Sequence, residues 1–225
     1  MRLRGIVLSS MDYKESSKIV YLYTEQGKIS VRANGANRPN NGLLGFTTAG
    51  NIVSFITTDS DFPSLSEYQI EHSGWISTKS LGLLEAIMIA LRVIGALPND
   101  INHKRTYAFI ENILININEE NYKKALAILL IKLSYPFGVA PSLRACTLCG
   151  SEINLNGFRV STGGAICRGC GGNNPKLLAI WHQYYYDRRK IEEYDDFNAN
   201  ILFKSIEEYY EAHMHIRLKL SLIKN

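Results

Sequence analysis

The chain has 225 residues, of which 46% are hydrophobic and 20% charged, and its formal net charge is +4. This length gives one large domain or two small ones with real cores, which excludes a disulfide-stapled mini-protein and a disordered chain. No uncharged apolar run reaches the roughly 20 residues of a bilayer span, and no apolar signal core follows the N-terminus, so we expect a cytoplasmic protein without a membrane role.

Five apolar runs with a period of two fill the first part of the chain. Turn residues separate them, and they cover residues 2–9, 18–24, 28–33, 51–58 and 65–71. The second and third runs are joined by residues 25–27, in which Gly27 supplies the left-handed conformation that such hairpins need. The pattern predicts a five-stranded barrel over residues 1–78.

From about Ser80 the apolar period becomes 3.6, which predicts a helical domain over residues 79–225. A segment rich in glycine, cysteine and asparagine interrupts it at residues 141–175. Asn174 and Pro175 are typical of the N-cap and the first residue of a helix. The apolar seam that runs from Leu202 to Ile223 predicts one last long helix.

The interruption contains all four cysteines of the chain as two C-x2-C pairs, seventeen residues apart, namely Cys146, Cys149, Cys167 and Cys170. This spacing is typical of a zinc site, because two intervening residues allow a tight turn to direct both sulfurs at one ion. Four thiolates complete a tetrahedron, so we expect one structural zinc per chain in an inserted ribbon. A catalytic zinc, an iron–sulfur cluster and a redox pair are the alternatives.

Basic residues are concentrated at the N-terminus. Residues 1–45 hold seven Lys and Arg against three acids, whereas residues 46–75 hold none against four. Tyr13, Tyr21 and Tyr23 lie among these cations, and a cationic barrel face with aromatic rings is how single-stranded nucleic acid is bound. A merely solvated surface is the alternative.

Several segments resemble the bacterial RecO family of recombination mediators. They are Arg4-Gly-Ile-Val-Leu8, Tyr13-Lys-Glu-Ser-Ser17, Tyr23-Thr-Glu-Gln-Gly-Lys28 and Asn34-Gly-Ala-Asn-Arg-Pro39 in the first part, then the cysteine segment, and Tyr210-Glu-Ala-His213 with Arg217-Leu-Lys219 near the end. The resemblance covers nearly the whole chain. It implies an α+β protein, with an N-terminal five-stranded OB-fold barrel followed by a helical domain that carries the inserted four-cysteine zinc ribbon.

The same resemblance implies a non-enzymatic mediator of DNA repair. Proteins of this family bind single- and double-stranded DNA, anneal complementary strands and help load RecA onto DNA coated by single-strand-binding protein. The implied partners are the C-terminal tail of that protein and RecR, with RecF in some cases, and the implied location is the cytoplasm, at the nucleoid. A zinc-ribbon module that binds RNA or protein is the alternative function.

Two sets of contact residues follow from this interpretation. We expect the DNA-binding residues where the first strands and the loop after the third frame a groove, at Arg4, Lys14, Lys18, Arg32 and Arg38. An acidic, aromatic tail needs an apolar pocket with a cationic rim. Residues of the helical domain with that chemistry are Lys104, Arg105, Tyr107 and Lys132.

Overall fold

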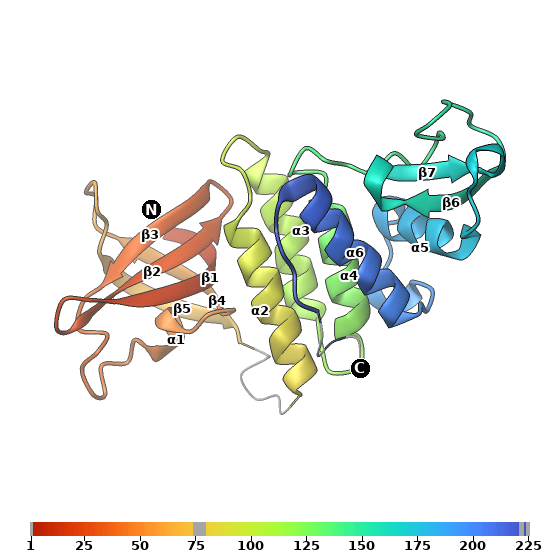
Figure 1. The fold of residues 1–225 in the computed structure, drawn as a ribbon. Helices are drawn as coiled ribbons and strands as arrows, with labels where there is room; N and C mark the ends of the chain where they lie inside the picture. Colours follow the sequence, from red (N-terminus) through yellow and green to blue (C-terminus); the bar gives the residue numbers. More distant parts are fainter. Residues whose placement is uncertain (1, 74–79, 221–222, 224–225) are drawn as a thin grey trace. The chain divides into compact units, whose positions relative to one another are not determined.

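The computed structural model describes residues 2–73, 80–220 and 223 (Figure 1). The chain divides into two compact units, the first formed by Met1–Ser80 and Ile87–Ile117 and the second by Leu81–Ala86 and Asn118–Asn225. The boundary predicted between residues 78 and 79 lies outside the described residues. Within the described ranges, every helix is too short or too polar to span a bilayer.

The first unit is built on one antiparallel sheet. Its strands are β1 (Arg2–Tyr13), β2 (Ser17–Thr24), β3 (Gly27–Ala33), β4 (Ile52–Thr57) and β5 (Leu65–His72), in the order β3-β2-β1-β4-β5. The five predicted strands are therefore confirmed. β1 is longer than predicted, because a bulge after Val7 lets the chain go on pairing with β2 as far as Tyr13.

The two edges of this sheet meet at one point. An isolated parallel bridge joins Arg32 in β3 to Ser64 just ahead of β5, and the backbone N–H of Arg32 donates to the Pro63 carbonyl at 2.9 Å. No ladder of hydrogen bonds between β3 and β5 extends this bridge in the described part of the sheet. The sheet is thus five-stranded but not closed, and the OB-fold barrel stays a prediction.

One face of the sheet forms the core of the first unit. Alternation along β2 and β3 buries Val20, Leu22, Val31 and Ala33 on this face, as the period of two predicts. The short helix α1 (Leu44–Thr47) adds Phe46, whose ring packs edge-on against Phe55 at a centroid distance of 5.6 Å. The alternate side chains of β1–β3 point to the opposite face of the sheet.

Helix α3 (His103–Asn116) covers the end of that opposite face. The Tyr23 hydroxyl hydrogen-bonds His103 Nδ1 at 3.1 Å, and the Tyr107 ring lies beside that of Tyr23 at a centroid distance of 6.2 Å. Lys28 Nζ donates to the Leu97 carbonyl at 2.7 Å, just past the end of α2 (Leu81–Gly95). Tyr23 is therefore buried, and the amine of the exposed Lys28 is held by backbone carbonyls of the same unit.

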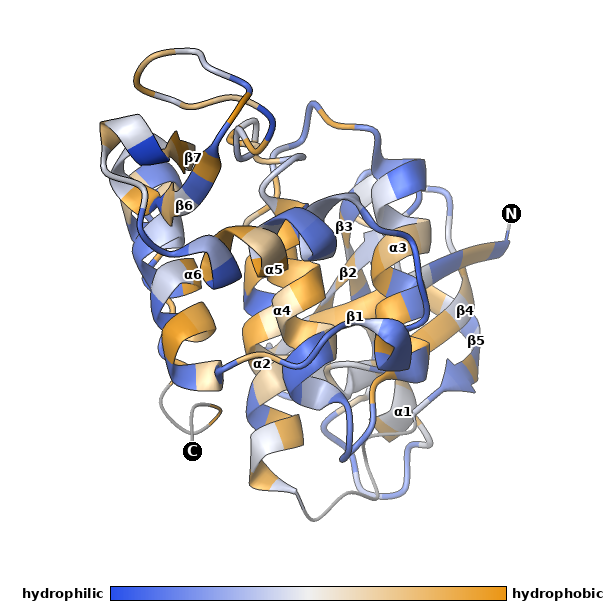
Figure 2. Cartoon of the chain, turned by 90° about the vertical axis from the view of Figure 1, so that its right-hand side faces the viewer, coloured by the Kyte–Doolittle hydropathy of each residue, from blue (hydrophilic) through white to orange (hydrophobic). Residues whose placement is uncertain are grey.

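The second unit is helical, with α4 (Tyr122–Leu133), α5 (Pro175–Tyr186) and α6 (Ala199–Met214). α4 is apolar along most of its length and colours orange in Figure 2, and residues 125–131 are all buried. α5 begins as predicted, with Pro175 in its first turn and the Asn174 side chain accepting from the backbone N–H of Leu177.

A two-stranded ribbon is inserted between α4 and α5. It consists of β6 (Leu155–Arg159) and β7 (Gly164–Cys167), and short 3-10 turns at Val160–Thr162 and Arg168–Cys170 follow the two strands. The Phe158 ring of β6 stacks on the Trp181 ring of α5, with centroids 4.2 Å apart and planes 12° apart. This stack joins the ribbon to the helices.

The last helix ends earlier than its apolar seam predicts. α6 stops at Met214 because His215 adopts a left-handed conformation with φ of 55°, and the N–H groups of His215 and Ile216 both donate to the Tyr210 carbonyl. Leu218, Leu220 and Ile223 are nevertheless buried. The seam therefore marks the buried residues correctly, while the prediction that they all belong to one helix is wrong.

Candidate nucleic-acid surface and metal centre

Four of the five predicted DNA-binding residues gather at one end of strands β1–β3. Register pairs Lys18 with Ala33 on the core side of the sheet and Arg32 with Ile19 on the outer side, so these two cations flank the end of the strands from opposite faces, and Lys14 follows in the β1–β2 turn. The loop after β3 reaches the same turn, since the Asn37 N–H donates to the Ser16 carbonyl at 3.0 Å, and it carries the exposed Arg38 next to it. The cations that make up this cluster are Lys14, Lys18, Arg32 and Arg38.

These four cations differ in how much of their charge is compensated. Lys18 Nζ bonds Asp12 at 2.6 Å, and that lysine lowers the pKa of the Asp12 carboxyl through their hydrogen bond. Arg32 instead donates to the neutral Ser64 hydroxyl from Nε and Nη2, at 3.0 and 2.7 Å, which leaves its positive charge in place. Arg32 and Arg38 are therefore the best placed of the set to meet a phosphate.

Arg4, the fifth predicted residue, is occupied elsewhere in the first unit. It sits opposite Ser54 of β4, and its guanidinium lies 3.2 Å from Glu111 of α3 and 3.7 Å from Glu71 of β5. Two carboxylates on one guanidinium leave no surplus positive charge for a phosphate. The structure thus gives Arg4 a role in attaching α3 to the sheet.

Aromatic and thioether side chains lie on the same face as Arg32. Two of them, Met11 and Phe62, were not predicted from the sequence. Met11 and Tyr21 are 51% and 39% exposed, and the Tyr21 hydroxyl donates to the Met11 sulfur. Phe62 comes from the β4–β5 loop and is 37% exposed. The sequence signal for Phe62 is its place as an aromatic residue directly after the polar residues 58–61.

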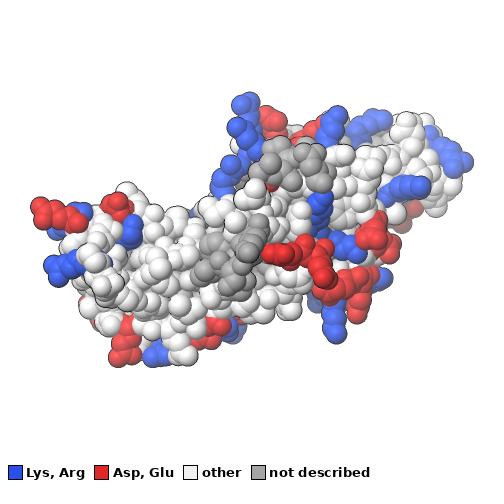
Figure 3. Space-filling model, turned by 90° about the horizontal axis from the view of Figure 1, so that it is seen from below, with Lys and Arg blue, Asp and Glu red and all other residues white. Residues whose placement is uncertain are grey.

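Acidic groups also occur in this part of the molecule. In the face shown in Figure 3, Lys and Arg side chains lie interspersed with Asp and Glu side chains on the part that carries the sheet. On the face in view, the sheet therefore presents charges of both signs and not a broad field of one sign.

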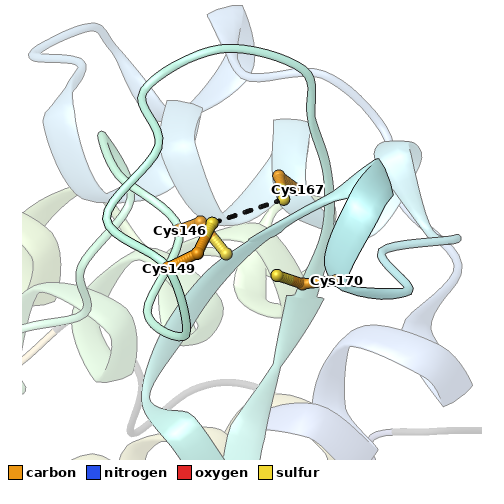
Figure 4. A group of neighbouring side chains, drawn as sticks. All are labelled: Cys146, Cys149, Cys167 and Cys170. Atoms are coloured by element: carbon orange, nitrogen blue, oxygen red, sulfur yellow. Dashed lines mark hydrogen bonds between the residues drawn. The ribbon is translucent and has the colours of Figure 1, made fainter.

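The second predicted site, the four cysteines, is assembled in the ribbon. Their sulfurs all lie within 4.8 Å of one another and point toward a common centre (Figure 4). The Cys149 and Cys167 sulfurs are 3.7 Å apart. Two thiolates bound tetrahedrally to one ion at about 2.3 Å lie about 3.8 Å apart, so this spacing suits a shared metal ion.

Local sequence explains why the sulfurs converge. Gly150 and Gly171 directly follow the two C-x2-C pairs with φ of 75° and 86°, a left-handed conformation that lets the backbone turn around each pair. The second turn also packs closely, because a Cβ at Gly172 would overlap the Ile166 carbonyl. The ribbon thus needs glycine at these places to hold the four thiols together.

The chemistry of the four thiols calls for a cation. The pKa of Cys146 is lowered to about 6, mainly because the backbone N–H of Cys167 points at its sulfur. The pKa of Cys170 is raised, mainly by its hydrogen bonds with the Cys149 and Cys167 thiols, since further thiolates beside the first are disfavoured. A bound metal dication removes this conflict, and the donor set can hold one.

The residues predicted for a partner's tail have mixed surroundings. Lys104 and Arg105 are exposed on α3, whereas Tyr107 is only 1% exposed and its hydroxyl donates to Glu111. In the second unit, Lys132 Nζ donates to the carbonyls of Tyr185 and Asp187 at the end of α5. The tail pocket stays a prediction.

Lys132 gives a prediction for the pH dependence of stability. Burial first, and the nearby Arg188 second, lower the pKa of Lys132 from its ordinary 10.5 to about 8. Between these values the unfolded chain binds more protons than the folded one, so stability rises with pH over this window. We expect the free energy of unfolding to increase from pH 7 to 9.5 by about 1 kcal/mol more in the wild type than in Lys132→Met, after allowance for solvent screening of the half-buried amine.

Urea unfolding at the two pH values measures this difference, and Lys176→Met, which removes an exposed lysine, is the control. Lys132→Met also loses the hydrogen bonds to the two carbonyls, which lowers its free energy of unfolding by a similar amount at both pH values. The test is therefore the change in the free energy of unfolding between the two pH values. The same pH trend in wild type and Lys132→Met would contradict the assignment.

Comparison with known proteins gives matches to one family over most of the chain. Residues 1–73 match the family model described as recombination protein O N terminal, and residues 86–221 match the one described as recombination protein O C terminal. The DNA repair protein RecO of Syntrophomonas wolfei is 29% identical over 184 residues, which cover 76% of this chain and 70% of that protein. The RecO proteins of Bacillus subtilis and Listeria monocytogenes are each 27% identical, over 97% of this chain and 91% of theirs. The two family models together span almost the whole sequence, and the chain therefore belongs to the RecO family of DNA repair proteins.

Proposed function

We propose that this protein is a DNA-binding recombination mediator. It binds single- and double-stranded DNA, anneals complementary strands and helps load RecA onto DNA coated by single-strand-binding protein, acting by binding rather than by catalysis. The observation that carries the proposal is the cluster of Lys14, Lys18, Arg32 and Arg38 at one end of strands β1–β3, with Arg32 on the outer face that also exposes aromatic rings.

The topology of the sheet supports an OB-fold. A five-stranded, partly open barrel whose strand 2–3 face and whose β1–β2 and β4–β5 loops bind oligonucleotides is the usual form of that fold. Here the bridge between Arg32 and Ser64 brings the first edge to the second, and the cation cluster lies at the end of strands β1–β3 near those loops, with Arg32 on that face. The proposed DNA path therefore follows the outer side of β1–β3.

Zinc is the metal we propose for the four cysteines. Tetrahedral sulfur coordination suits Zn²⁺, and four thiolates leave no open position for a substrate or a water molecule. When bound, the ion supplies a fixed positive centre that holds the two turns of the ribbon together. Cys146, Cys149, Cys167 and Cys170 would be its ligands.

The remaining proposals concern partners and location. Exposed Lys104 and Arg105 on α3 remain the residues that we propose for the acidic tail of single-strand-binding protein. RecR, with RecF in some cases, and RecA are the proposed pathway partners. The protein would act in the cytoplasm, at the nucleoid.

The double variant Arg32→Ala/Arg38→Ala tests the DNA surface. Each lost phosphate contact lowers the slope of log affinity against log salt by about 0.7 on single strands, so we expect a slope shallower by about 1.4 and weaker binding to every sequence. Fluorescence anisotropy with labelled oligonucleotides at several salt concentrations measures this. Annealing of oligonucleotides coated by single-strand-binding protein should slow in parallel.

Lys204→Ala/Arg217→Ala is the matched control, because it removes the same net charge from exposed positions in the second unit. It should leave the slope unchanged. Equal slopes in the wild type and in Arg32→Ala/Arg38→Ala would refute the surface, and annealing no faster with the protein than without it would refute the mediator role.

A further inference from the structure

The β4–β5 loop holds Phe62 in a defined place. The Thr58 N–H donates to the Ser64 carbonyl at 2.9 Å, and the Ser64 N–H donates to the Thr58 hydroxyl at 2.9 Å. The Ser60 hydroxyl donates to the Phe62 carbonyl at 3.1 Å. These bonds close the loop on itself, so the phenyl ring is presented from an ordered turn.

Phe62 is the centre of a group of flat side chains. Its ring packs edge-on against Tyr13, with centroids 6.1 Å apart, and the Arg32 guanidinium lies 5.7 Å from its centroid. Tyr13 is on the same face of β1 as Met11, and Lys14 Nζ lies 5.3 Å from the Tyr13 centroid. The group joins the β1–β2 and β4–β5 loops across one end of the face.

The charge around Phe62 differs from the charge around the cation cluster. Asp59 and Asp61 are exposed in the same loop, and residues 46–75 hold no Lys or Arg. These carboxylates offset the positive charge of Arg32 near the ring, so a phosphate is less favoured at this loop than at the exposed Arg38. A neutral, flat group can stack on the ring and is not repelled by the carboxylates of the loop. The bases of nucleic acid have that chemistry.

We propose that Phe62, supported by Tyr13, is a stacking site for an unpaired base of single-stranded DNA. Paired bases in a duplex are stacked on one another and do not offer their faces, so this site favours single strands. Arg32, which touches the Phe62 ring, would connect the base-binding end of the face to the phosphate-binding cluster. The inference rests on the proposed function, because it assumes that single-stranded DNA follows this face.

An oligonucleotide without bases separates stacking from charge. Oligo-dT and an abasic strand of equal length carry the same phosphates, so their affinities differ only through the bases. We expect the wild type to bind oligo-dT more tightly than the abasic strand. In Phe62→Ala the affinity for oligo-dT should fall about tenfold while that for the abasic strand hardly changes, and the salt slope should stay as in the wild type.

Two further variants check that the ring itself matters. Phe62→Tyr keeps a ring and should bind as the wild type does, whereas Phe62→Leu keeps apolar bulk and should behave like Phe62→Ala. Thermal unfolding of each variant, expected within a few degrees of the wild type because Phe62 is partly exposed, excludes a general loss of structure.

The outcomes distinguish this inference from the proposed function. If Phe62→Ala weakens binding to both strands equally, or to neither, the stacking site is wrong even though DNA binding stands. If the wild type binds neither strand, the proposed function itself fails. Tighter binding of oligo-U than of oligo-dT would assign the site to RNA and overturn the proposal for DNA.

Discussion

Replacing Cys167 by serine is expected to abolish binding of the proposed zinc and to unfold the ribbon. Structural zinc contributes on the order of 10 kcal/mol to the folding of small zinc-binding peptides. The buried cluster around the thiols is small, because it consists of Cys146, Ile166 and Cys167, so the turns that carry the cysteines depend on the metal. The loss should therefore be the largest of any single substitution in the second unit.

Elemental analysis should find one zinc per wild-type chain and none in Cys167→Ser, and the chelated wild type should lose the ribbon's protection from proteolysis. Arg168→Ala, an exposed change in the same turn, is the control that should keep its metal. A wild-type protein with no metal and four titratable thiols would contradict the assignment. Affinity for single strands should change little, since the cation cluster belongs to the first unit.

Trp181→Ala should be the most damaging change outside the metal centre, with a loss of about 3–5 kcal/mol in the free energy of unfolding. Trp181 is 1% exposed and packs against Phe158 of the ribbon and Tyr209 of α6. Its indole N–H donates to the Ser205 hydroxyl at 3.0 Å. Truncation leaves a large cavity where three elements meet.

Urea or thermal unfolding of the zinc-loaded protein measures this loss. Trp181→Phe is the matched control, because it keeps an aromatic ring against Phe158 and gives up only the indole donor and part of the volume. We expect it to lose about 1–2 kcal/mol. An alanine variant no less stable than the phenylalanine variant would show that the stack contributes nothing.

The features that the sequence predicted well depend on residues near one another in the chain. The C-x2-C pairs and the glycines after them determine their own turns, and Asn174 with Pro175 determines the start of α5. The five strands followed from alternation over short windows. Each of these needs only local chemistry.

The features that could not be predicted depend on contacts between distant residues. Lys28 is one of the seven basic residues of the first 45, but its amine is held by the carbonyls of Gly95 and Leu97. Arg4 was assigned to DNA, and two carboxylates from other elements take its charge. The Phe62 ring contacts Tyr13 and Arg32, which come from two other parts of the sheet, so its surroundings could not be predicted from the neighbouring sequence.

The attachment of α3 to the β2–β3 hairpin decides which fragment of this protein can be studied by itself. Cutting the chain after residue 78 would strip the cover from Tyr23, remove the acceptors of Lys28 and leave Arg4 without Glu111. The piece that keeps these partners extends through α3, to residue 117. The part proposed to bind DNA is therefore a sheet together with a helix far along the sequence, and genetic truncations at the end of the sheet would damage it while seeming to isolate it.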